Sequence, residues 1–330
     1  MISNRNLIDE VLAGKALSEK EAYKILTATG STLTSYFAGA QYLKEKYFSN
    51  NAHLCSITNA KSGHCSEDCS FCAQSSHYQT DAPVYGLKKP EDLLKDAKEA
   101  DQNGHACYSI VTSGARIEPG HEFEQIETAL RMIRSQTTVS PSVSIGTIDL
   151  ETAQRLVAAG CKTYHHNLET ARSFYPNICT THAYEDDINT LKYAKKAGLR
   201  VCSGGIFGLG ETLEQRIELG MTLRELDIDS IPINFLTPIP GTPLEGQNQL
   251  TPIDCLRVIC LFRYLLPAKT ITICGGREKN LRDFQSCIFM AGANGMMVGN
   301  YLTTSGRNFD MDIQLLEDAE VTVNAEAYNT

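Results

Sequence analysis

Three cysteines in one short polar segment have the spacing of a metal site. The segment NAKSGHCSEDCSFCAQSS arranges them as C-x3-C-x2-C, at Cys65, Cys69 and Cys72. A polar loop offers no core for a thiol to fill, so packing does not explain the cluster. Zinc would take a fourth ligand from His64 or His77, but no second cysteine pair follows at zinc-ribbon spacing. An iron–sulfur cubane fits better, because three thiolates hold three irons and leave the fourth iron open for another ligand.

The elements around this segment alternate regularly. Short apolar runs alternate with amphipathic stretches from residue 53 onward, after a helical start. The expected strands are 53–58, 105–111, 142–146, 162–167, 200–206, 230–236, 270–274 and 295–299. The expected helices are 90–103, 121–135, 149–159, 184–197, 211–226, 252–265 and 280–290. Four glycines at or before strand starts are expected to end helices in the left-handed conformation, namely Gly104, Gly160, Gly198 and Gly295.

This alternation predicts an α/β protein built as a (β/α)8 barrel of the TIM type. Eight parallel strands close such a barrel, and active sites lie at the carboxyl ends of its strands. The cysteine segment follows the first strand and would lie at that end. An open doubly wound sheet is the alternative. We expect an N-terminal helical extension (1–50), the barrel (51–305) and a loosely held acidic C-terminal tail (306–330).

The composition limits the class of protein. The chain has 330 residues, of which 42% are hydrophobic and 21% charged, with a net charge of −9. These values suit a folded protein with a sizeable core and argue against nucleic acid or an anionic membrane as a partner. We find no membrane span and no secretory signal, so the twelve cysteines indicate a reducing cytoplasm rather than a disulfide scaffold.

The cysteine motif resembles that of the radical S-adenosylmethionine (SAM) superfamily in its spacing, its place after the first strand and the aromatic Phe71 before its last cysteine. Four further stretches, in the same order, resemble the biotin synthase family. They are YHHNLET (164–170), VCSGGIFGLGET (201–212), PINFLTPIPGTPLEG (232–246) and FMAGANGMMVGNYLTT (289–304). The resemblance covers about residues 53 to 304.

The resemblance implies an enzyme, a sulfurtransferase that inserts sulfur into dethiobiotin to form biotin. A [4Fe–4S] cluster on the three loop cysteines would bind SAM, whose reductive cleavage gives a 5′-deoxyadenosyl radical that abstracts hydrogen. The sulfur would come from an auxiliary iron–sulfur cluster. The family further implies a flavodoxin- or ferredoxin-type electron donor and a homodimer.

The resemblance also assigns residues to SAM. Phe71 would lie near the adenine, and Asn167 and Glu169 would bind the ribose. Ser113 and Gly114 would approach the methionine part, where glycine permits a close backbone approach. Judged without the resemblance, Asn167 and Glu169 could simply cap the next helix.

Four more residues are assigned by the same resemblance. Ile206 and Gly208 belong to the stretch that matches the adenine-side strand, although its glycines could make only a strand-to-helix turn. Asn234 matches a contact to the ureido ring of dethiobiotin, which suits an amide because it both donates and accepts. His165 stands where the family usually places an asparagine for the same contact.

The sequence departs from the family at the auxiliary cluster. The family pattern has three cysteines and an arginine, and two of these positions hold Cys107 and Cys202. The third cysteine position falls on Ser142, and the arginine position falls on Thr272. Serine is a hard ligand where a soft thiolate is preferred, and threonine carries no charge. Half of the usual ligand set is therefore absent.

We hypothesise that Cys55 and Cys274 complete a different set. Residues i and i+2 of a strand face the same way, so Cys274 is expected to share the face of Thr272. Cys55 lies on the first strand, before Cys65. Four thiols favour an auxiliary cluster of the four-iron type, with [2Fe–2S] and ligation by Ser142 as alternatives. Cys55 and Cys274 could also be buried thiols without a ligand role.

The remaining cysteines fit packing better. Cys255, Cys260 and Cys287 lie on expected helices, and Cys161 precedes a strand at the opposite end of the barrel. Cys179 lies in a loop after the fourth strand and is the reserve ligand candidate.

Two other functions stay open from the sequence. One is a related radical SAM enzyme resembling a hydrogenase maturase or methylornithine synthase, with a different substrate. The other is a non-catalytic barrel that stores or senses iron–sulfur clusters.

Overall fold

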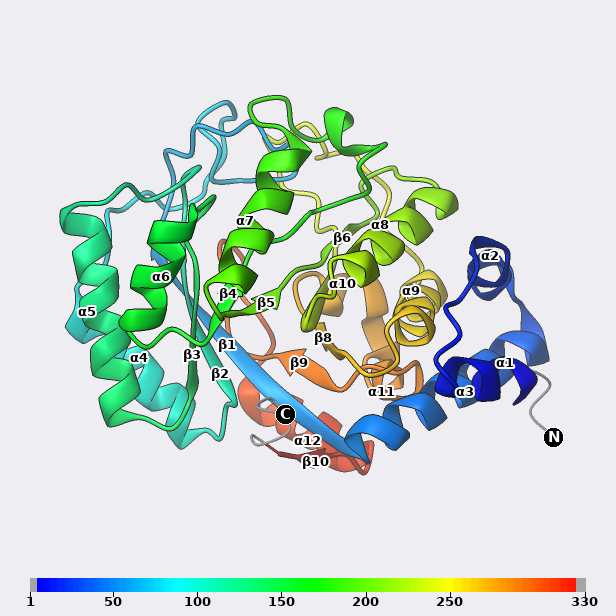
Figure 1. The fold of residues 1–330 in the computed structure, drawn as a ribbon. Coiled ribbons are helices and arrows are strands. Elements are labelled where there is room, and N and C mark those ends of the chain that lie inside the picture. The colour runs from blue at the N-terminus through cyan, green and yellow to red at the C-terminus, as the bar shows by residue number, and fades with distance from the viewer. Residues whose placement is uncertain (1–4, 325–330) are drawn as a thin grey trace.

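The computed structural model describes residues 5–324. Three helices come first: α1 (Arg5–Leu12), α2 (Glu19–Thr27) and α3 (Gly30–Phe48). A capping box begins α2, because the Ser18 hydroxyl accepts from the Glu21 N–H while the Glu21 carboxylate accepts from the Ser18 N–H. Figure 1 shows the three helices in blue at one side of the barrel, where α2 and α3 pack on α9 (Pro252–Leu265).

The predicted eight-stranded parallel barrel is confirmed (Figure 1). Its strands are β1 (Asn51–Lys61), β2 (Cys107–Thr112), β3 (Ser140–Ser144), β4 (Thr163–His165), β5 (Arg200–Cys202), β6 (Gly205–Phe207), β7 (Ser230–Phe235), β8 (Thr270–Ile273) and β9 (Gly295–Met297). The short strands β5 and β6 both pair with β7 and together form one of the eight strands of the barrel. Since β1 pairs with both β2 and β9, the ring closes and the open-sheet alternative is wrong.

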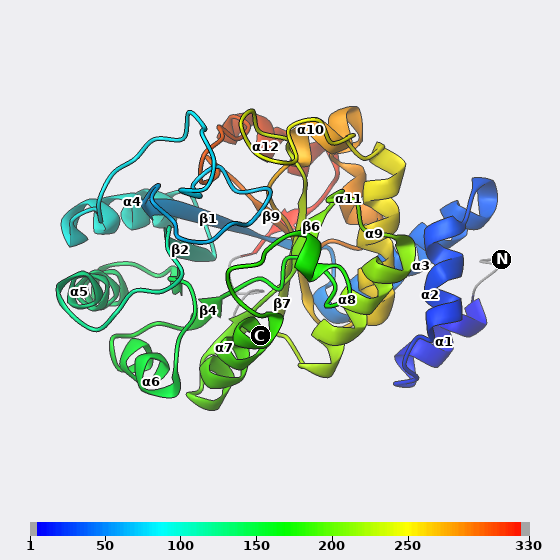
Figure 2. The ribbon, with the colours of Figure 1, turned by 90° about the horizontal axis from the view of Figure 1, so that it is seen from above.

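Helices cover the outside of the ring, as Figure 2 shows from above. Besides α9 they are α4 (Pro90–Gln102), α5 (His121–Gln136), α6 (Leu150–Ala158), α7 (Tyr184–Lys196), α8 (Leu213–Glu225), α10 (Arg277–Leu281), α11 (Cys287–Met290) and α12 (Phe309–Asp318). In α4 the buried residues Leu93, Leu94, Ala97 and Ala100 recur at helical spacing and form the face toward the barrel.

The fifth strand is interrupted, whereas the sequence predicted one strand over 200–206. The register pairs Cys202 with Ser230 and Gly205 with Ile233, so Gly204 lies opposite Pro232 of β7. Proline has no N–H to donate, and a Cβ on Gly204 would lie 1.9 Å from the Pro232 carbonyl oxygen. The ladder therefore breaks at this pair and resumes as β6.

Two local predictions were wrong. The single helix over 280–290 is divided into α10, a 3-10 turn and α11, because Arg282 adopts a left-handed φ of 50° at the end of α10. Gly295 is not a helix cap but lies in β9, where a Cβ would meet the His53 ring at 2.1 Å. The left-handed glycine after α11 is Gly292, with φ of 109°.

The expectation of a loosely held C-terminal tail was also wrong for residues 306–324. They form α12 and β10 (Thr322–Val323), and β10 pairs with β1. Leu315 and Leu316 of α12 are buried, which gives this segment an apolar reason to stay in place. The predicted tail residues 325–330 lie outside the described residues, and the division at 50 and 305 stays a prediction. Within residues 5–324 no helix has the length and apolar character needed to cross a membrane.

Candidate functional site

A cavity of about 690 Å³ lies at the carboxyl ends of the strands. Its wall brings together residues that are far apart in the sequence. Those that the sequence analysis singled out are Cys65, Cys69, Phe71, Cys72, Gly114, His165, Asn167, Glu169, Cys179, Ile206, Asn234 and Cys274. Ser113 and Gly208 are not on this wall. Most residues expected to contact SAM or substrate therefore share one chamber.

Backbone and amide hydrogen bonds shape the cysteine loop. The Cys65 N–H donates to the Gln74 carbonyl at 3.0 Å, and the Cys72 N–H donates to the Cys69 carbonyl at 2.9 Å. The side-chain oxygen of Gln74 accepts from the Ser62 hydroxyl at 2.9 Å. All three cysteines are free thiols on the cavity wall. This donor set fits a [4Fe–4S] cluster held by three thiolates, beside a cavity that fits a further ligand.

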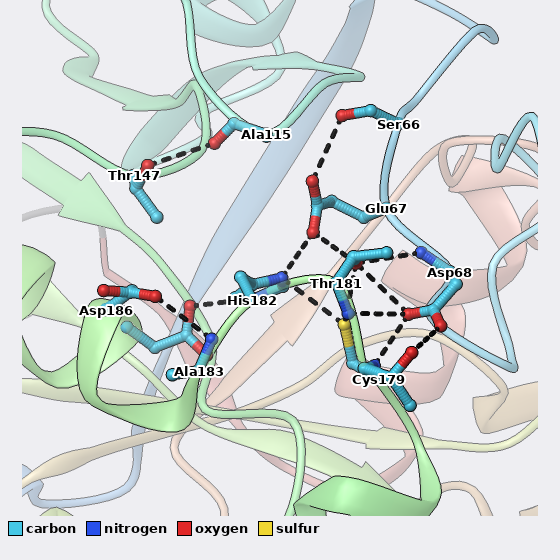
Figure 3. A network of polar contacts seen from close by, with 12 residues as sticks. Ser66, Glu67, Asp68, Ala115, Thr147, Cys179, Thr181, His182, Ala183 and Asp186 are labelled. Carbon is cyan, nitrogen blue, oxygen red and sulfur yellow. Dashed lines mark hydrogen bonds and ion pairs between the residues drawn. The ribbon is translucent and has the colours of Figure 1, made fainter.

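A polar network joins the cysteine loop to the segment between β4 and α7 (Figure 3). The Asp68 carboxylate accepts from the Thr180 N–H at 2.8 Å. The Glu67 carboxylate accepts from Nδ1 of His182 at 2.5 Å. The Cys179 sulfur lies 3.3 Å from the same nitrogen. These contacts hold the cysteine loop against the barrel although the two segments are more than a hundred residues apart in the chain.

Cys179 and His182 are in contact next to a predicted cluster ligand. A hydrogen bond from Cys69, followed by that from His182, lowers the pKa of Cys179 to about 4. Hydrogen bonds to Asp187 and to Cys179 raise the pKa of His182 to about 11. Glu67, Cys179 and His182 offer possible metal-ligand atoms within 4.8 Å of one another. His182 Nδ1, however, already contacts both the Glu67 carboxylate and the Cys179 sulfur at hydrogen-bonding distance. The reserve candidate Cys179 thus lies beside Cys69.

The two residues assigned to the ribose are held by strand backbone. The Asn167 side-chain oxygen accepts from the Gly204 N–H at 3.2 Å, and its amide donates to the Glu169 carboxylate at 3.4 Å. The Glu169 carbonyl accepts from the Ile206 N–H at 2.8 Å. Because the next α-helix begins only at Tyr184, the alternative that these residues cap it is wrong.

Glu169 has two unusual properties for an acid. Its φ is 60°, in the left-handed region that non-glycine residues rarely occupy. Loss of hydration, and then the charge of Asp187, raises the pKa of its carboxyl to about 8. A carboxyl that keeps its proton near neutral pH can donate a hydrogen bond as well as accept one.

Asn234 and His165 retain hydrogen-bonding capacity for a ligand. The Asn234 oxygen accepts from the Gly275 N–H at 2.9 Å, and its amide donates to the Gly205 carbonyl at 3.4 Å. One N–H and one lone pair of the amide remain. His165 lies 3.2 Å from the Asn167 oxygen, and burial lowers its pKa to about 4. The neutral ring both donates and accepts, as the family's asparagine does.

Ser113 and Gly208 act on the backbone around the cavity. The Ser113 hydroxyl donates to the Gly63 carbonyl at 2.7 Å, just before the cysteine motif. The Gly208 N–H donates to the Glu211 carboxylate at 3.0 Å, which Arg216 holds in a buried ion pair at 2.7 Å. Both residues therefore shape loops that carry wall residues.

Four thiols lie close enough to influence one another, three of them on different strands and Cys274 one residue past β8, and we call Cys55, Cys107, Cys202 and Cys274 the chamber thiols. Cys55 and Cys107 are neighbours in the register of β1 and β2. A hydrogen bond between them, followed by burial and the charges of the other two, raises the pKa of Cys55. Burial, and next the charge of Cys202, raises the pKa of Cys274. Of the four, only Cys274 lies on the cavity wall, so it links the chamber thiols to the residues expected to bind SAM and substrate.

The two positions that depart from the family pattern have partners of their own. The Ser142 hydroxyl lies 3.4 Å from the Cys107 sulfur and also donates to the Tyr108 carbonyl at 3.3 Å. The Thr272 hydroxyl lies 2.9 Å from Nε2 of His53, a ring whose pKa burial lowers to about 4. A neutral pair therefore occupies the position where the family has a cation.

Sequence analysis missed the C-terminal segment that forms part of the wall. Tyr301 and Leu302 line the cavity, and the Asn59 amide donates to the Leu302 carbonyl at 2.9 Å. The stretch GNYLTT contributed to the resemblance, but no spacing or residue type in it indicated a wall. No local pattern indicated His182 either. Glu67 lies inside the cysteine motif, so its place at the site could have been inferred from the sequence.

Known proteins resemble this chain over nearly its whole length. Residues 60–222 match the radical SAM superfamily, and residues 232–322 match the biotin and thiamin synthesis associated domain. The chain is 57% identical over 316 residues to the biotin synthase of Syntrophotalea carbinolica, covering 96% of this chain and 97% of that protein. It is 56% identical to the biotin synthase of Geotalea daltonii, covering 96% of each.

Solved structures share the fold at low identity. Methylornithine synthase superposes with a TM-score of 0.85 at 19% identity, covering 98% of this chain and 99% of that one. A maturase of the [FeFe]-hydrogenase superposes with a TM-score of 0.83 at 17% identity, covering 98% of this chain and 76% of that one. These two likenesses show the barrel alone. The curated relatives match nearly the whole chain at more than half identity, and the chain therefore belongs to the biotin synthase family of the radical SAM superfamily.

Proposed function

We propose that this protein is a sulfurtransferase that converts dethiobiotin into biotin by radical SAM chemistry. Two C–H bonds of dethiobiotin each give a hydrogen atom to a 5′-deoxyadenosyl radical, and two C–S bonds form to one sulfur atom. The [4Fe–4S] cluster with SAM supplies the radical when both are bound. The alternatives, another radical SAM substrate or a non-catalytic cluster protein, have no comparable support, because the relatives that match the full chain are biotin synthases.

One observation carries the assignment of the sulfur source. Cys274 is on the wall of the cavity that contains Asn234, and it also lies within reach of the charges of Cys202 and Cys107. A cluster held by the chamber thiols would therefore face a substrate bound at Asn234. Their thiol donors suit an iron–sulfur cluster, since soft thiolates are its preferred ligands.

We further propose that this auxiliary cluster is of the four-iron type. Four thiols supply the four ligands of such a cluster, as they also could of a [2Fe–2S] cluster, and the pair Thr272–His53 offers no cation for the arginine of the family's usual [2Fe–2S] ligand set. Ser142 accompanies Cys107 at 3.4 Å as a hydrogen-bonding neighbour. A [2Fe–2S] cluster that uses Ser142 would instead leave one chamber thiol unligated.

The protein's own residues bind, orient and enclose the reactants. Asn167 and Glu169 present an amide and a protonated carboxyl to the ribose hydroxyls. Asn234 and neutral His165 offer donors and acceptors to the ureido ring. Tyr301 and Leu302 close one side of the cavity, which limits the access of water to a reactive radical.

Anaerobic turnover of fully reconstituted protein with dethiobiotin tests the function. Biotin, 5′-deoxyadenosine and residual acid-labile sulfide are measured in the same samples. We expect Cys274→Ala to retain 5′-deoxyadenosine formation and to lower biotin formation by about tenfold or more, since loss of a group that only supports a metal ligand already has an effect of this size. The matched control is Cys260→Ala, which removes a fully buried thiol on α9, outside the chamber.

The outcomes separate the parts of the proposal. SAM cleavage that dethiobiotin does not stimulate would contradict the substrate assignment. Normal biotin formation by Cys274→Ala would show that Cys274 only packs. Iron analysis with Mössbauer spectroscopy tests whether an auxiliary cluster is present, because about four irons per chain, all lost with the loop cysteines, would exclude one.

The electron donor and the assembly state are proposals that rest on the family. We propose a flavodoxin- or ferredoxin-type donor and a homodimer. Support of turnover by reduced flavodoxin tests the donor, and the mass in solution by light scattering tests the dimer.

A further inference from the structure

The turn after β8 carries Cys274 and is tied to β7 on one side. The Cys274 N–H donates to the Ile233 carbonyl at 2.9 Å. The next N–H, of Gly275, donates to the Asn234 side chain at 2.9 Å. A Cβ on Gly276 would lie 1.8 Å from the Phe235 carbonyl oxygen, so the turn touches the backbone of β7 directly. One turn thus positions a chamber thiol and the predicted substrate amide together.

The other side of this turn is held by the C-terminal helix. Arg277, at the start of α10, is fully buried, and its Nη2 donates to both carboxylate oxygens of Asp312 at 2.9 and 2.8 Å. Asp312 is itself fully buried on α12. Arg277 also donates to Gln285 at 2.8 Å. Figure 2 shows α10 and α12 on the same side of the barrel, although the two ion-pair partners are 35 residues apart in the chain.

A second contact links the same helix α10 to the C-terminal cavity wall. The Tyr301 hydroxyl donates to the Glu278 carboxylate at 3.0 Å. The Arg307 N–H donates to the same carboxylate at 3.2 Å. The segment from Tyr301 to Asp312 is therefore fastened to α10 at two successive residues, Arg277 and Glu278.

We propose that Asp312 is a positioning residue that acts through Arg277 to hold Cys274 and Asn234 in place. The directional, doubly hydrogen-bonded pair fixes the start of α10 and with it the preceding turn. Breaking the pair takes from Arg277 its nearest carboxylate, at 2.8 Å, and leaves only Glu278 at 3.8 Å, which favours opening of the segment that carries the pair. Only the ligand role of Cys274 rests on the proposed function; the positioning rests on the contacts alone.

The test is the alkylation rate of single thiols in the full-length protein with its clusters removed. Iodoacetamide is added, and mass spectrometry follows Cys274 and Cys260 in the same sample. Both thiols are buried in the native fold, at 2% and 0% exposure, so Cys260 reports general loosening of the protein. We expect Asp312→Asn to raise the rate at Cys274 relative to Cys260 by about tenfold or more.

The matched control is Asp310→Asn, the same change at an exposed position in the first turn of α12. It removes a similar interaction with the helix dipole and should leave the ratio of the two rates unchanged. A ratio that stays unchanged in Asp312→Asn, or rates that rise together, would overturn the proposal, since the pair would then serve general stability or nothing. If Asp312→Asn does not fold, Arg277→Met/Asp312→Leu removes both charges at similar volume, and the same ratio is measured.

Reconstituted protein separates this proposal from the proposed function. With Asp312→Asn, we expect auxiliary-cluster iron and biotin formation to fall while 5′-deoxyadenosine formation persists. A raised Cys274 rate with unchanged auxiliary-cluster iron would support positioning by Asp312 and contradict ligation by Cys274.

Discussion

At the scale of single residues, burial sets the charge state of the groups in the cavity. The pKa of Glu169 is raised to about 8, while the pKa of His165 is lowered to about 4. Both shifts favour the neutral form, because an ion at the cavity wall loses hydration. Neutral donors and acceptors suit the uncharged ribose and ureido groups that the proposed function places there.

This shift of Glu169 predicts a pH dependence of stability. Between about pH 4.5 and 8 the folded protein keeps a proton that the unfolded chain loses, so the free energy of unfolding falls as pH rises through this window. In metal-free protein, Glu169→Gln should remove roughly 2–3 kcal/mol of this fall, after screening at a half-buried site. Thermal unfolding at pH 5 and 8.5 measures it, with Glu99→Gln, at an exposed position on α4, as the control. Parallel pH curves for wild type and Glu169→Gln would contradict the shift.

At the scale of elements, the junction between β4 and β6 depends on the absence of a side chain. A Cβ on Gly205 would lie 2.4 Å from the Glu169 carbonyl oxygen and 2.8 Å from Leu219. This close approach allows the bridge between Glu169 and Gly205 that holds the end of β4. The position of Glu169 on the wall therefore depends on a glycine of the neighbouring strand.

We therefore expect Gly205→Ala to lower stability by about 2–4 kcal/mol and to weaken SAM binding, because β6 must move away from Glu169. Gly86→Ala is the control, since a Cβ there meets nothing within 4 Å, and it should change stability by less than about 0.5 kcal/mol. Denaturant unfolding and SAM titration by calorimetry measure both effects. Equal stabilities for the two variants would mean that the junction adapts without cost.

At the scale of the whole molecule, the C-terminal segment belongs to the folded body. Its helix α12 buries Leu315 and Leu316 and supplies Asp312 to Arg277, while β10 pairs with the first two residues of β1. The matched domain that ends at residue 322 spans the predicted boundary at 305. Residues 306–324 are thus part of the folded barrel.

A truncation series tests this. A chain ending at residue 324 should retain the melting temperature of the full chain, since all described contacts remain. A chain ending at residue 305 should lose several kcal/mol, because it exposes apolar surface and removes the nearest carboxylate of Arg277, that of Asp312. Melting temperatures by circular dichroism compare the two. Equal values would restore the interpretation of 306–330 as a loose tail.

The sequence alone determined the features that depend on neighbours in the chain. The spacing of Cys65, Cys69 and Cys72 needs only one loop, and the order of strands and helices follows from local periodicity. The barrel follows from that order, because eight βα units have few other ways to close. The interruption at Gly204 was not visible, since its cause is Pro232 on another strand.

Tertiary structure decided which distant residues meet. Closure of β9 against β1 and the register between strands brought Cys55 and Cys107 together and set Cys274 within reach of the charge of Cys202. Same-face alternation suggested this grouping, but only the barrel's register fixes it. The pairs Arg277–Asp312 and Glu67–His182 left no trace in local pattern. An ion pair between distant segments depends on the path of the whole chain, and that path exists only once the barrel has closed.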